Sequence, residues 1–265
     1  MTHRGSIVLL MAACVVACAL IAPAGPVAAW ADTAGTSAND EEAAPKITTI
    51  KKTLRVYQQI VIVGAEASGT IKWKSSNKKV AKVTKTGIIT AKRKGKATIF
   101  ASFDDGRLVC KLTVKKSKFK PVKLTKLANY SNFRQRASYA QLKKAYKKAL
   151  KIVRPFGDLG KKKRLMGVAN ALRALYDEGK VTYSTTAAHY NDPYGYLVKG
   201  KASCAGCTRA TGMCLNILGI KYEHVNENKW THQWCRVKVG KAYWICDAYG
   251  LYCGKEPGKR KHPFL

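Results

Sequence analysis

The stretch HQWCRVKVGKAYWICDA, residues 232–248, indicates how the C-terminal half of this chain folds. Apolar and polar residues alternate from Cys235 to Val239, and an apolar run follows Gly240, which is consistent with two antiparallel strands joined by a tight turn. We predict these strands over residues 233–239 and 241–248. With a Val239-Gly240 turn, His232 lies directly opposite Asp247. With a Gly240-Lys241 turn the two are diagonal neighbours, so either register puts them on one face of the hairpin.

A helix is predicted to begin at or just before Cys204 and to end before Gly219. Unpaired backbone N–H groups and the positive end of the helix dipole favour a thiolate at that position. The Cys204 N–H can also donate to an oxyanion. A cysteine nucleophile needs a base, and the base needs an orienting group. His232 and Asp247 supply both, so we take Cys204, His232 and Asp247 as a candidate catalytic triad.

Three blocks of sequence, in this order, resemble the transglutaminase-like superfamily of papain-like cysteine enzymes: residues 194–206, 231–234 and 241–248. The resemblance implies an α+β core and acyl transfer through a thioester on Cys204. It also implies a peptide or protein amide substrate and neither cofactor nor metal. Cys207 stands where the family usually has an aromatic residue, and Cys235 where Asn is common. Hydrolysis is favoured over transfer to an amine, because nothing in the sequence marks an amine site.

The cysteines allow other interpretations. Cys204 and Cys207 form the Cys-x-x-Cys spacing of thiol oxidoreductases, but a Tyr- and Gly-rich loop precedes them instead of a core strand. Zinc binding by this pair and two of Cys235, His232 and Cys246 would lack a second closely spaced ligand pair. We expect Cys207 and Cys214 to face the core. His189 and His224 have no partner in the sequence and are expected on the surface or in loops.

The segment from 46 to 116 reads as a small β-sandwich. Turn signals such as Thr86-Gly87 separate short strand-like runs. The last run alternates, with one apolar face that would bury Cys110. The predicted strands are 54–63, 70–74, 79–83, 88–91, 96–103 and 108–114.

This segment also resembles a family, the bacterial Ig-like domain of group 2. The resemblance rests on Trp73–Asn77, Val80–Val83, Gly87–Ala91, Gly95–Ile99 and Cys110–Val114. It implies a surface module for spacing or adhesion. The expected fold is therefore an all-β Ig-like sandwich (46–116), a linker (117–125) and an α+β papain-like, transglutaminase-like catalytic domain (126–265). Within the latter we predict helices over 138–153, with a Ser138–Gln141 capping box, and 159–175.

Residues 1–31 have the features of a signal peptide: Arg4, an apolar run over 7–22, and Ala29-Trp30-Ala31 as a cleavage site. Residues 32–45 read as a disordered spacer. No second apolar stretch is long enough to cross a bilayer, so we expect no transmembrane segment in the mature chain. The sequence predicts a secreted, extracellular or cell-wall-associated protein.

The net charge limits the kinds of partner expected, and the cysteine count limits the possible disulfides. Lys and Arg number 49 against 15 Asp and Glu, a formal net charge of +34, which attracts polyanions. Export favours an anionic cell-wall polymer and disfavours nucleic acid. Of the nine cysteines, two (Cys14, Cys18) leave with the signal peptide, and an odd remainder leaves at least one thiol unpaired within the chain. The pairing among Cys110, Cys207, Cys214, Cys235, Cys246 and Cys253 stays open. A non-catalytic envelope adhesion protein is the alternative function.

Overall fold

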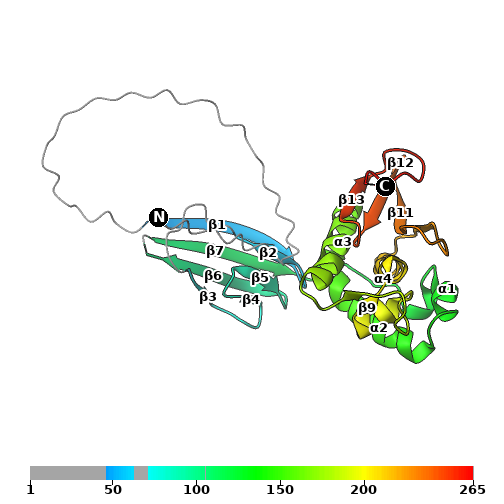
Figure 1. Ribbon diagram of the computed structural model, residues 1–265. Coiled ribbons are helices and arrows are strands. Elements are labelled where there is room, and N and C mark those ends of the chain that lie inside the picture. Colours follow the sequence, from blue (N-terminus) through cyan, green and yellow to red (C-terminus); the bar gives the residue numbers. More distant parts are fainter. Residues whose placement is uncertain (1–45, 63–70, 105, 265) are drawn as a thin grey trace, which may run out of the picture.

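The computed structural model describes residues 46–62, 71–104 and 106–264 (Figure 1). The predicted signal peptide and spacer lie outside the described residues. Within the described part of the chain, no helix is long and apolar enough to cross a membrane. The chain forms a β-rich N-terminal region followed by a region of mixed helices and strands.

Two sheets make up the N-terminal region. One has the strand order β1-β7-β6-β3, with bounds Lys46–Arg55, Gly106–Lys115, Gly95–Phe103 and Lys72–Ser75. The other has the order β2-β5-β4, with bounds Gln59–Val61, Ile88–Ala91 and Ala81–Val83. Strands β1 and β7 are parallel, and the remaining pairs are antiparallel.

Strand β7 shows why these residues form a sandwich. Its even-numbered residues from 106 to 114 are buried and its odd-numbered residues are not, as the period of two predicts. Cys110 is fully buried among Ile89, Ile99 and Leu112 from both sheets, and burial raises the pKa of its thiol. The prediction of a single strand over 54–63 is wrong. The chain turns at Tyr57, which has φ +78°, and β1 starts well before residue 54.

The mixed region contains three longer helices and a four-stranded sheet. The helices are α2 (Tyr139–Val153), α3 (Lys161–Asp177) and α4 (Cys204–Ile217), with the shorter α1 (Tyr130–Arg134), η1 (Leu124–Lys126), η2 (Arg154–Phe156) and η3 (Gly195–Lys199). The antiparallel sheet has the order β10-β11-β12-β13, with bounds Glu223–Val225, Trp234–Val239, Ala242–Asp247 and Tyr252–Lys255. A small parallel pair joins β8 (Thr182–Tyr183) to β9 (Lys201–Ala202).

Helix α4 is the centre of this region and packs against α2, α3 and β11 (Figure 1). Every residue from Ala205 to Ile217 is buried, so the helix is covered on all sides and only its first residue, Cys204, stays partly exposed. The capping box of α2 is confirmed: Ser138 Oγ accepts from Gln141 N at 3.3 Å, and Gln141 Oε1 accepts from Ser138 N at 2.8 Å.

The hairpin β11–β12 takes the second of the two predicted registers. Val239 pairs with Ala242, so the turn consists of Gly240 and Lys241, and Gly240 has φ +62°. Cys235 therefore lies directly opposite Cys246. The segment predicted as a linker contacts the mixed region, because Asp158 accepts hydrogen bonds from Ser117 Oγ and Lys118 N, each at 2.7 Å.

Candidate active site

Cys204 is the first residue of α4, preceded by Ser203 in an extended conformation. Its thiol is free and partly exposed. Gly206, the third residue of the helix, lets the loop before it pack closely: a Cβ there would lie 2.3 Å from the Tyr190 carbonyl oxygen. Ser203 N donates to that same Tyr190 oxygen at 2.8 Å. The loop at Tyr190 thus holds the tip of the helix that carries the thiol.

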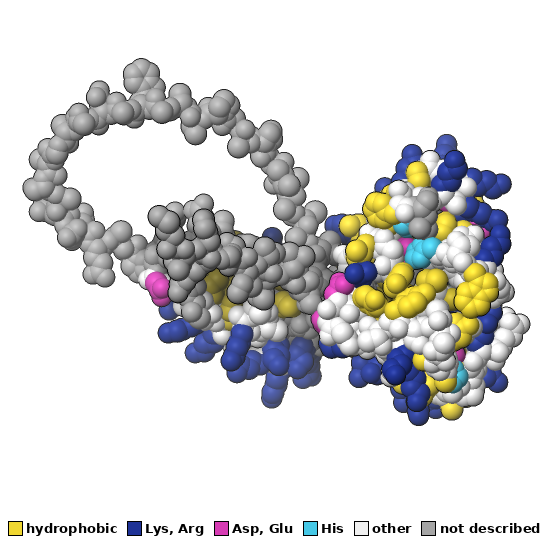
Figure 2. All heavy atoms as spheres, in the orientation of Figure 1, with side chains coloured by type: hydrophobic (Ala, Val, Ile, Leu, Met, Phe, Trp, Pro, Cys, Tyr) yellow, Lys and Arg dark blue, Asp and Glu magenta, His cyan; other side chains and the backbone are white. Residues whose placement is uncertain are grey.

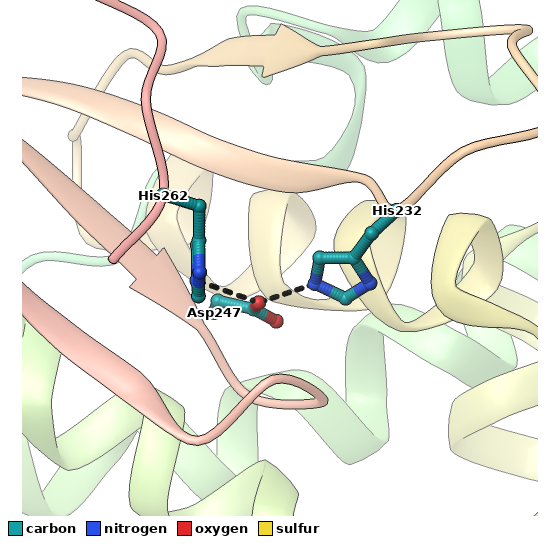
Figure 3. A group of neighbouring side chains, drawn as sticks. All are labelled: His232, Asp247 and His262. Atoms are coloured by element: carbon teal, nitrogen blue, oxygen red, sulfur yellow. Dashed lines mark hydrogen bonds and ion pairs between the residues drawn. The ribbon is translucent and has the colours of Figure 1, made fainter. Parts of the chain in front are cut away.

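His232 and Asp247 form a hydrogen-bonded pair. His232 Nε2 lies 2.5 Å from Asp247 Oδ2 (Figure 3). Asp247 is the last residue of β12, and its Oδ1 accepts from Tyr249 N at 3.0 Å and Gly250 N at 2.9 Å. Because Nε2 of His232 contacts the carboxylate, Nδ1 is the ring nitrogen that can exchange a proton with the Cys204 thiol.

Contacts between α4 and β11 bring Cys204 to His232, which lies just before that strand. Thr208 Oγ1 donates to the Gln233 carbonyl oxygen at 2.9 Å, and Cys235 Sγ donates to the Thr208 carbonyl oxygen at 3.3 Å. The Cys204 thiol consequently lies close to the His232 ring in the same cleft, and its interaction with the ring helps to raise the pKa of His232. All three residues of the predicted triad are therefore brought together by the fold.

Interactions within this group favour the charged forms of His232 and Asp247. Burial by itself lowers the pKa of His232, but hydrogen bonds and charge interactions with Asp247 and Cys204 outweigh it and raise that pKa to about 9. Burial would raise the pKa of Asp247, whereas hydrogen bonds from His232 and His262 hold it below the ordinary value. At neutral pH the arrangement is therefore an imidazolium on His232 beside an ionised Asp247 carboxylate.

His262, which the sequence did not single out, is a third member of the cluster. It follows β13 in the C-terminal segment, and its side chain is only 1% exposed. Its Nε2 lies 3.3 Å from the same Asp247 oxygen that holds His232 (Figure 3). The ring packs edge-on against Trp234, with 5.3 Å between ring centroids. No motif surrounds His262, so only its spatial position reveals it.

The site opens into a cleft of about 470 Å³, lined by residues of α4 and its N-cap and by parts of the segments 183–191, 228–233 and Tyr249. Cys204 and His232 lie together among its lining residues. Four aromatic side chains line it, Tyr183, Tyr190, Trp230 and Tyr249, and Trp230 is 93% exposed. Among the described residues that line the cleft, Arg209 and Lys229 carry positive charge and none is acidic. The cleft therefore suits a neutral or acidic substrate with apolar groups.

Arg209 links two walls of the cleft by hydrogen bonds. It lies on α4, and its side chain is almost fully buried. Its guanidinium donates to the Asn191 carbonyl oxygen at 2.9 Å and to Glu227 Oε1 at 2.8 Å. Burial lowers the pKa of Arg209 from its ordinary value. The loops that carry Asn191 and Glu227 are thus fixed to the helix that carries Cys204.

The remaining cysteines and histidines lie elsewhere. Cys207 and Cys214 are buried in the core as predicted, and burial raises the pKa of both thiols. His189 lies in a loop, as expected, and its Nδ1 lies 2.6 Å from Asp192 Oδ2. The expectation for His224 is wrong, because this residue belongs to β10, its side chain is only 5% exposed, and its Nε2 lies 2.7 Å from Gln233 Oε1. Burial lowers the pKa of His224 to about 4.

His232, Asp247 and His262 are residue types that bind metals, and their ligand atoms lie within 4.8 Å of one another. Two ligands of one tetrahedral zinc ion, each bonded at about 2.0–2.1 Å, stand roughly 3.3 Å apart. The 2.5 Å between His232 and Asp247 is instead a hydrogen-bond distance. In the described part of the chain, the zinc ligands proposed around Cys204 and Cys207 are not gathered at one point.

Comparison with known families assigns the N-terminal region. Residues 44–114 match the model of the bacterial Ig-like domain of group 2. This region is a bacterial Ig-like domain. Such domains are often extracellular. No transglutaminase-like family matches the remainder of the chain, and no curated protein matches the sequence.

Proposed function

We propose that the C-terminal region is a cysteine acyl-transfer enzyme, related to the transglutaminase-like, papain-like enzymes, that cleaves amide bonds. One observation carries the proposal: the Cys204 thiol, at a helix N-terminus, shares a cleft with an imidazole held by Asp247 at 2.5 Å. The nucleophile, the base and the orienting carboxylate thus stand in the order that thiol catalysis requires.

The geometry supports a two-step reaction. The Cys204 sulfur attacks the amide carbonyl carbon, and the first N–H groups of α4 can stabilise the oxyanion. The C–N bond breaks as His232 Nδ1 gives its proton to the leaving amine, which produces a thioester. Water then attacks the thioester while Nδ1 takes a proton from it. The S–C bond breaks, the acid leaves, and the thiolate and imidazolium return.

Hydrolysis is favoured over transfer to an amine. Nothing in the described lining of the cleft is acidic, so no carboxylate is placed there to hold a cationic amine acceptor. Amide and hydroxyl side chains such as Asn191, Asn228 and Thr231 offer hydrogen bonds to a peptide backbone. The aromatic side chains, Trp230 above all, offer apolar surface for its side chains.

The site of action proposed is the bacterial cell envelope. The Ig-like domain, the predicted signal peptide and the net charge of +34 agree on an exported protein held by anionic wall polymer. The rival function is a non-catalytic envelope adhesion protein, which the exposed Trp230 would also suit.

Trapping distinguishes the two functions. The protein is incubated with a library of acylating peptides and amides, and adducts are mapped by mass spectrometry. We expect a thioester on Cys204, lost in Cys204→Ala and kept in Cys207→Ala. If no substrate or activated ester acylates Cys204 faster than a denatured control, the enzyme proposal fails and the adhesion function stands.

A further inference from the structure

The carboxylate of Asp247 lies between two imidazoles, one hydrogen-bonded to it at 2.5 Å and the other 3.3 Å away. Its Oδ1 is saturated by the backbone N–H groups of Tyr249 and Gly250, and its Oδ2 faces both His232 and His262. Such a carboxylate cannot turn without losing a donor on one side or the other.

The tautomer of His262 is set by its other nitrogen. Phe264 N donates to His262 Nδ1 at 3.3 Å, so Nδ1 is an acceptor and Nε2 carries the proton. That nitrogen is buried and lies 3.3 Å from Asp247 Oδ2, and among the described residues it makes no other aligned hydrogen bond. The ring itself is clamped between aromatic neighbours, with centroid distances of 5.3 Å to Trp234 and 5.5 Å to Tyr252.

We propose that His262 is a positioning residue that holds Asp247 for His232, so that the C-terminal segment completes the active site. His262 is absent from the cleft lining and therefore acts through Asp247 without touching substrate. This inference rests on the proposed function of Cys204.

The test measures turnover of an activated ester, p-nitrophenyl acetate, by the full chain. His262→Phe keeps an aromatic ring but removes the donor, and we expect kcat to fall about 10- to 100-fold with KM unchanged. His262→Gln, which can place an amide N–H where Nε2 lies, is expected to recover most of that loss. A His262→Phe protein within twofold of wild-type kcat, or a loss confined to KM, overturns the positioning role. If Cys204→Ala is as active as wild type, the proposed function has failed instead.

A second inference concerns the solvent face of the Ig-like sheet β1-β7-β6-β3. The residues pointing away from the sandwich core there include Lys51, Arg55, Lys96, Arg107, Lys111 and Lys115, which we name the basic face. Within the described strands of this sheet no residue is acidic. Lys and Arg side chains also gather along one side of this region in Figure 2.

The register of β1 and β7 places like charges side by side. Lys51 pairs with Lys111, and Arg55 pairs with Lys115, on strands about 4.8 Å apart. Lysine on an edge strand such as β1 protects against aggregation. Edge protection does not account for the lysines of β7, which has a neighbour on each side. Repulsion between these pairs is relieved when an anion lies between them.

A shallow hollow of about 480 Å³ lies on this face, lined by Lys51, Lys96 and Lys111 together with the hydroxyls of Thr98 and Thr113. Ammonium groups and hydroxyls are donors to anionic oxygens. Binding of single-stranded nucleic acid draws on aromatic side chains that stack with bases. Phe100 is the one aromatic side chain on the described part of this face, and it is half-buried. The face therefore fits a polyanion without bases.

We infer that the basic face binds a linear anionic wall polymer. The assay titrates full-length Cys204→Ala protein with fluorescent poly(glycerol phosphate), poly-glutamate and single-stranded DNA between 50 and 300 mM NaCl. Because this chain lacks the nucleophile, binding is tested separately from catalysis. The first two polymers distinguish phosphate from carboxylate as the anionic group.

The variant Lys51→Gln/Lys96→Gln/Lys111→Gln is expected to bind at least 10-fold more weakly at 50 mM NaCl. Its matched control, Lys143→Gln/Lys144→Gln/Lys147→Gln on the exposed side of α2, removes the same charge and should change affinity less than twofold. Without polymer the first variant should melt at or above the wild-type temperature, because repulsion is removed. Equal losses in both variants, or tightest binding to DNA, overturn the inference. A Lys51→Arg/Lys96→Arg/Lys111→Arg variant that binds as the wild type does shows that charge and not packing is responsible.

Discussion

Asp247→Asn is the sharpest probe of the site, because it removes one charge with almost no change in shape. In the native site the pKa of His232 is about 9 against an ordinary value of 6.5, although burial alone would lower it. That difference corresponds to about 3 kcal/mol of preference for the imidazolium. Asp247 contributes through a hydrogen bond and through its charge, and Cys204 supplies the rest. We therefore expect the pKa of His232 to fall to roughly 7–8 in the variant.

The assay is the rate at which iodoacetamide alkylates Cys204, followed by peptide mass spectrometry across pH 5 to 11. In the wild type the rate should change as pH rises through about 9, where the imidazolium loses its proton. In Asp247→Asn this step should move down by one to two pH units. Turnover at pH 7 should fall by about 10²- to 10⁴-fold, because the imidazole is neither oriented nor stabilised when charged.

A matched control exists in the same region. Asp192 holds His189 at 2.6 Å and also accepts backbone N–H bonds from Tyr194 and Gly195. Asp192→Asn should lower stability yet leave the alkylation step of Cys204 where it was. An Asp247→Asn protein whose step stays near pH 9 would refute the coupling of the carboxylate to His232.

Four further outcomes are expected. Cys204→Ala should abolish turnover with little loss of stability, because the helix tip packs little. Cys207→Ala, which changes a core residue, should keep most turnover and lower the free energy of unfolding by about 1 kcal/mol. A turnover assay measures the first effect and urea titration measures the second. Since folding raises the pKa of His232, its stabilisation is complete below pH 6.5 and is lost as pH rises through about 9. Thermal melts should therefore show the C-terminal region weakening over that window, and less so in His232→Gln. In Gly250→Ala the new Cβ would lie 2.3 Å from Asp247 Oδ2 and 3.0 Å from His232 Nε2. Ester turnover should fall at least about 10-fold while the melting of the Ig-like domain stays unchanged, and an unaffected rate would contradict the close packing at this glycine.

Features that depend on neighbours in the chain could be predicted. The alternation along β7 follows from the period of two, and the capping box at Ser138 follows from a three-residue spacing. The start of α4 at Cys204 follows from the small residues that precede an apolar run. The break at Tyr57 escaped prediction, because a tyrosine with positive φ leaves no sequence signal of the kind that glycine does.

For the candidate site, the sequence by itself determined which side chains have the right chemistry: a thiol at a helix start, and a histidine and an aspartate on one hairpin. It left two registers open, and packing of the whole sheet selected the Gly240-Lys241 turn. Only the tertiary structure decided that Thr208 docks on Gln233, and that His262 reaches Asp247. The physical reason is that hydrogen bonds within a helix or hairpin are encoded by short spacings, whereas contacts between distant segments depend on how the entire core packs.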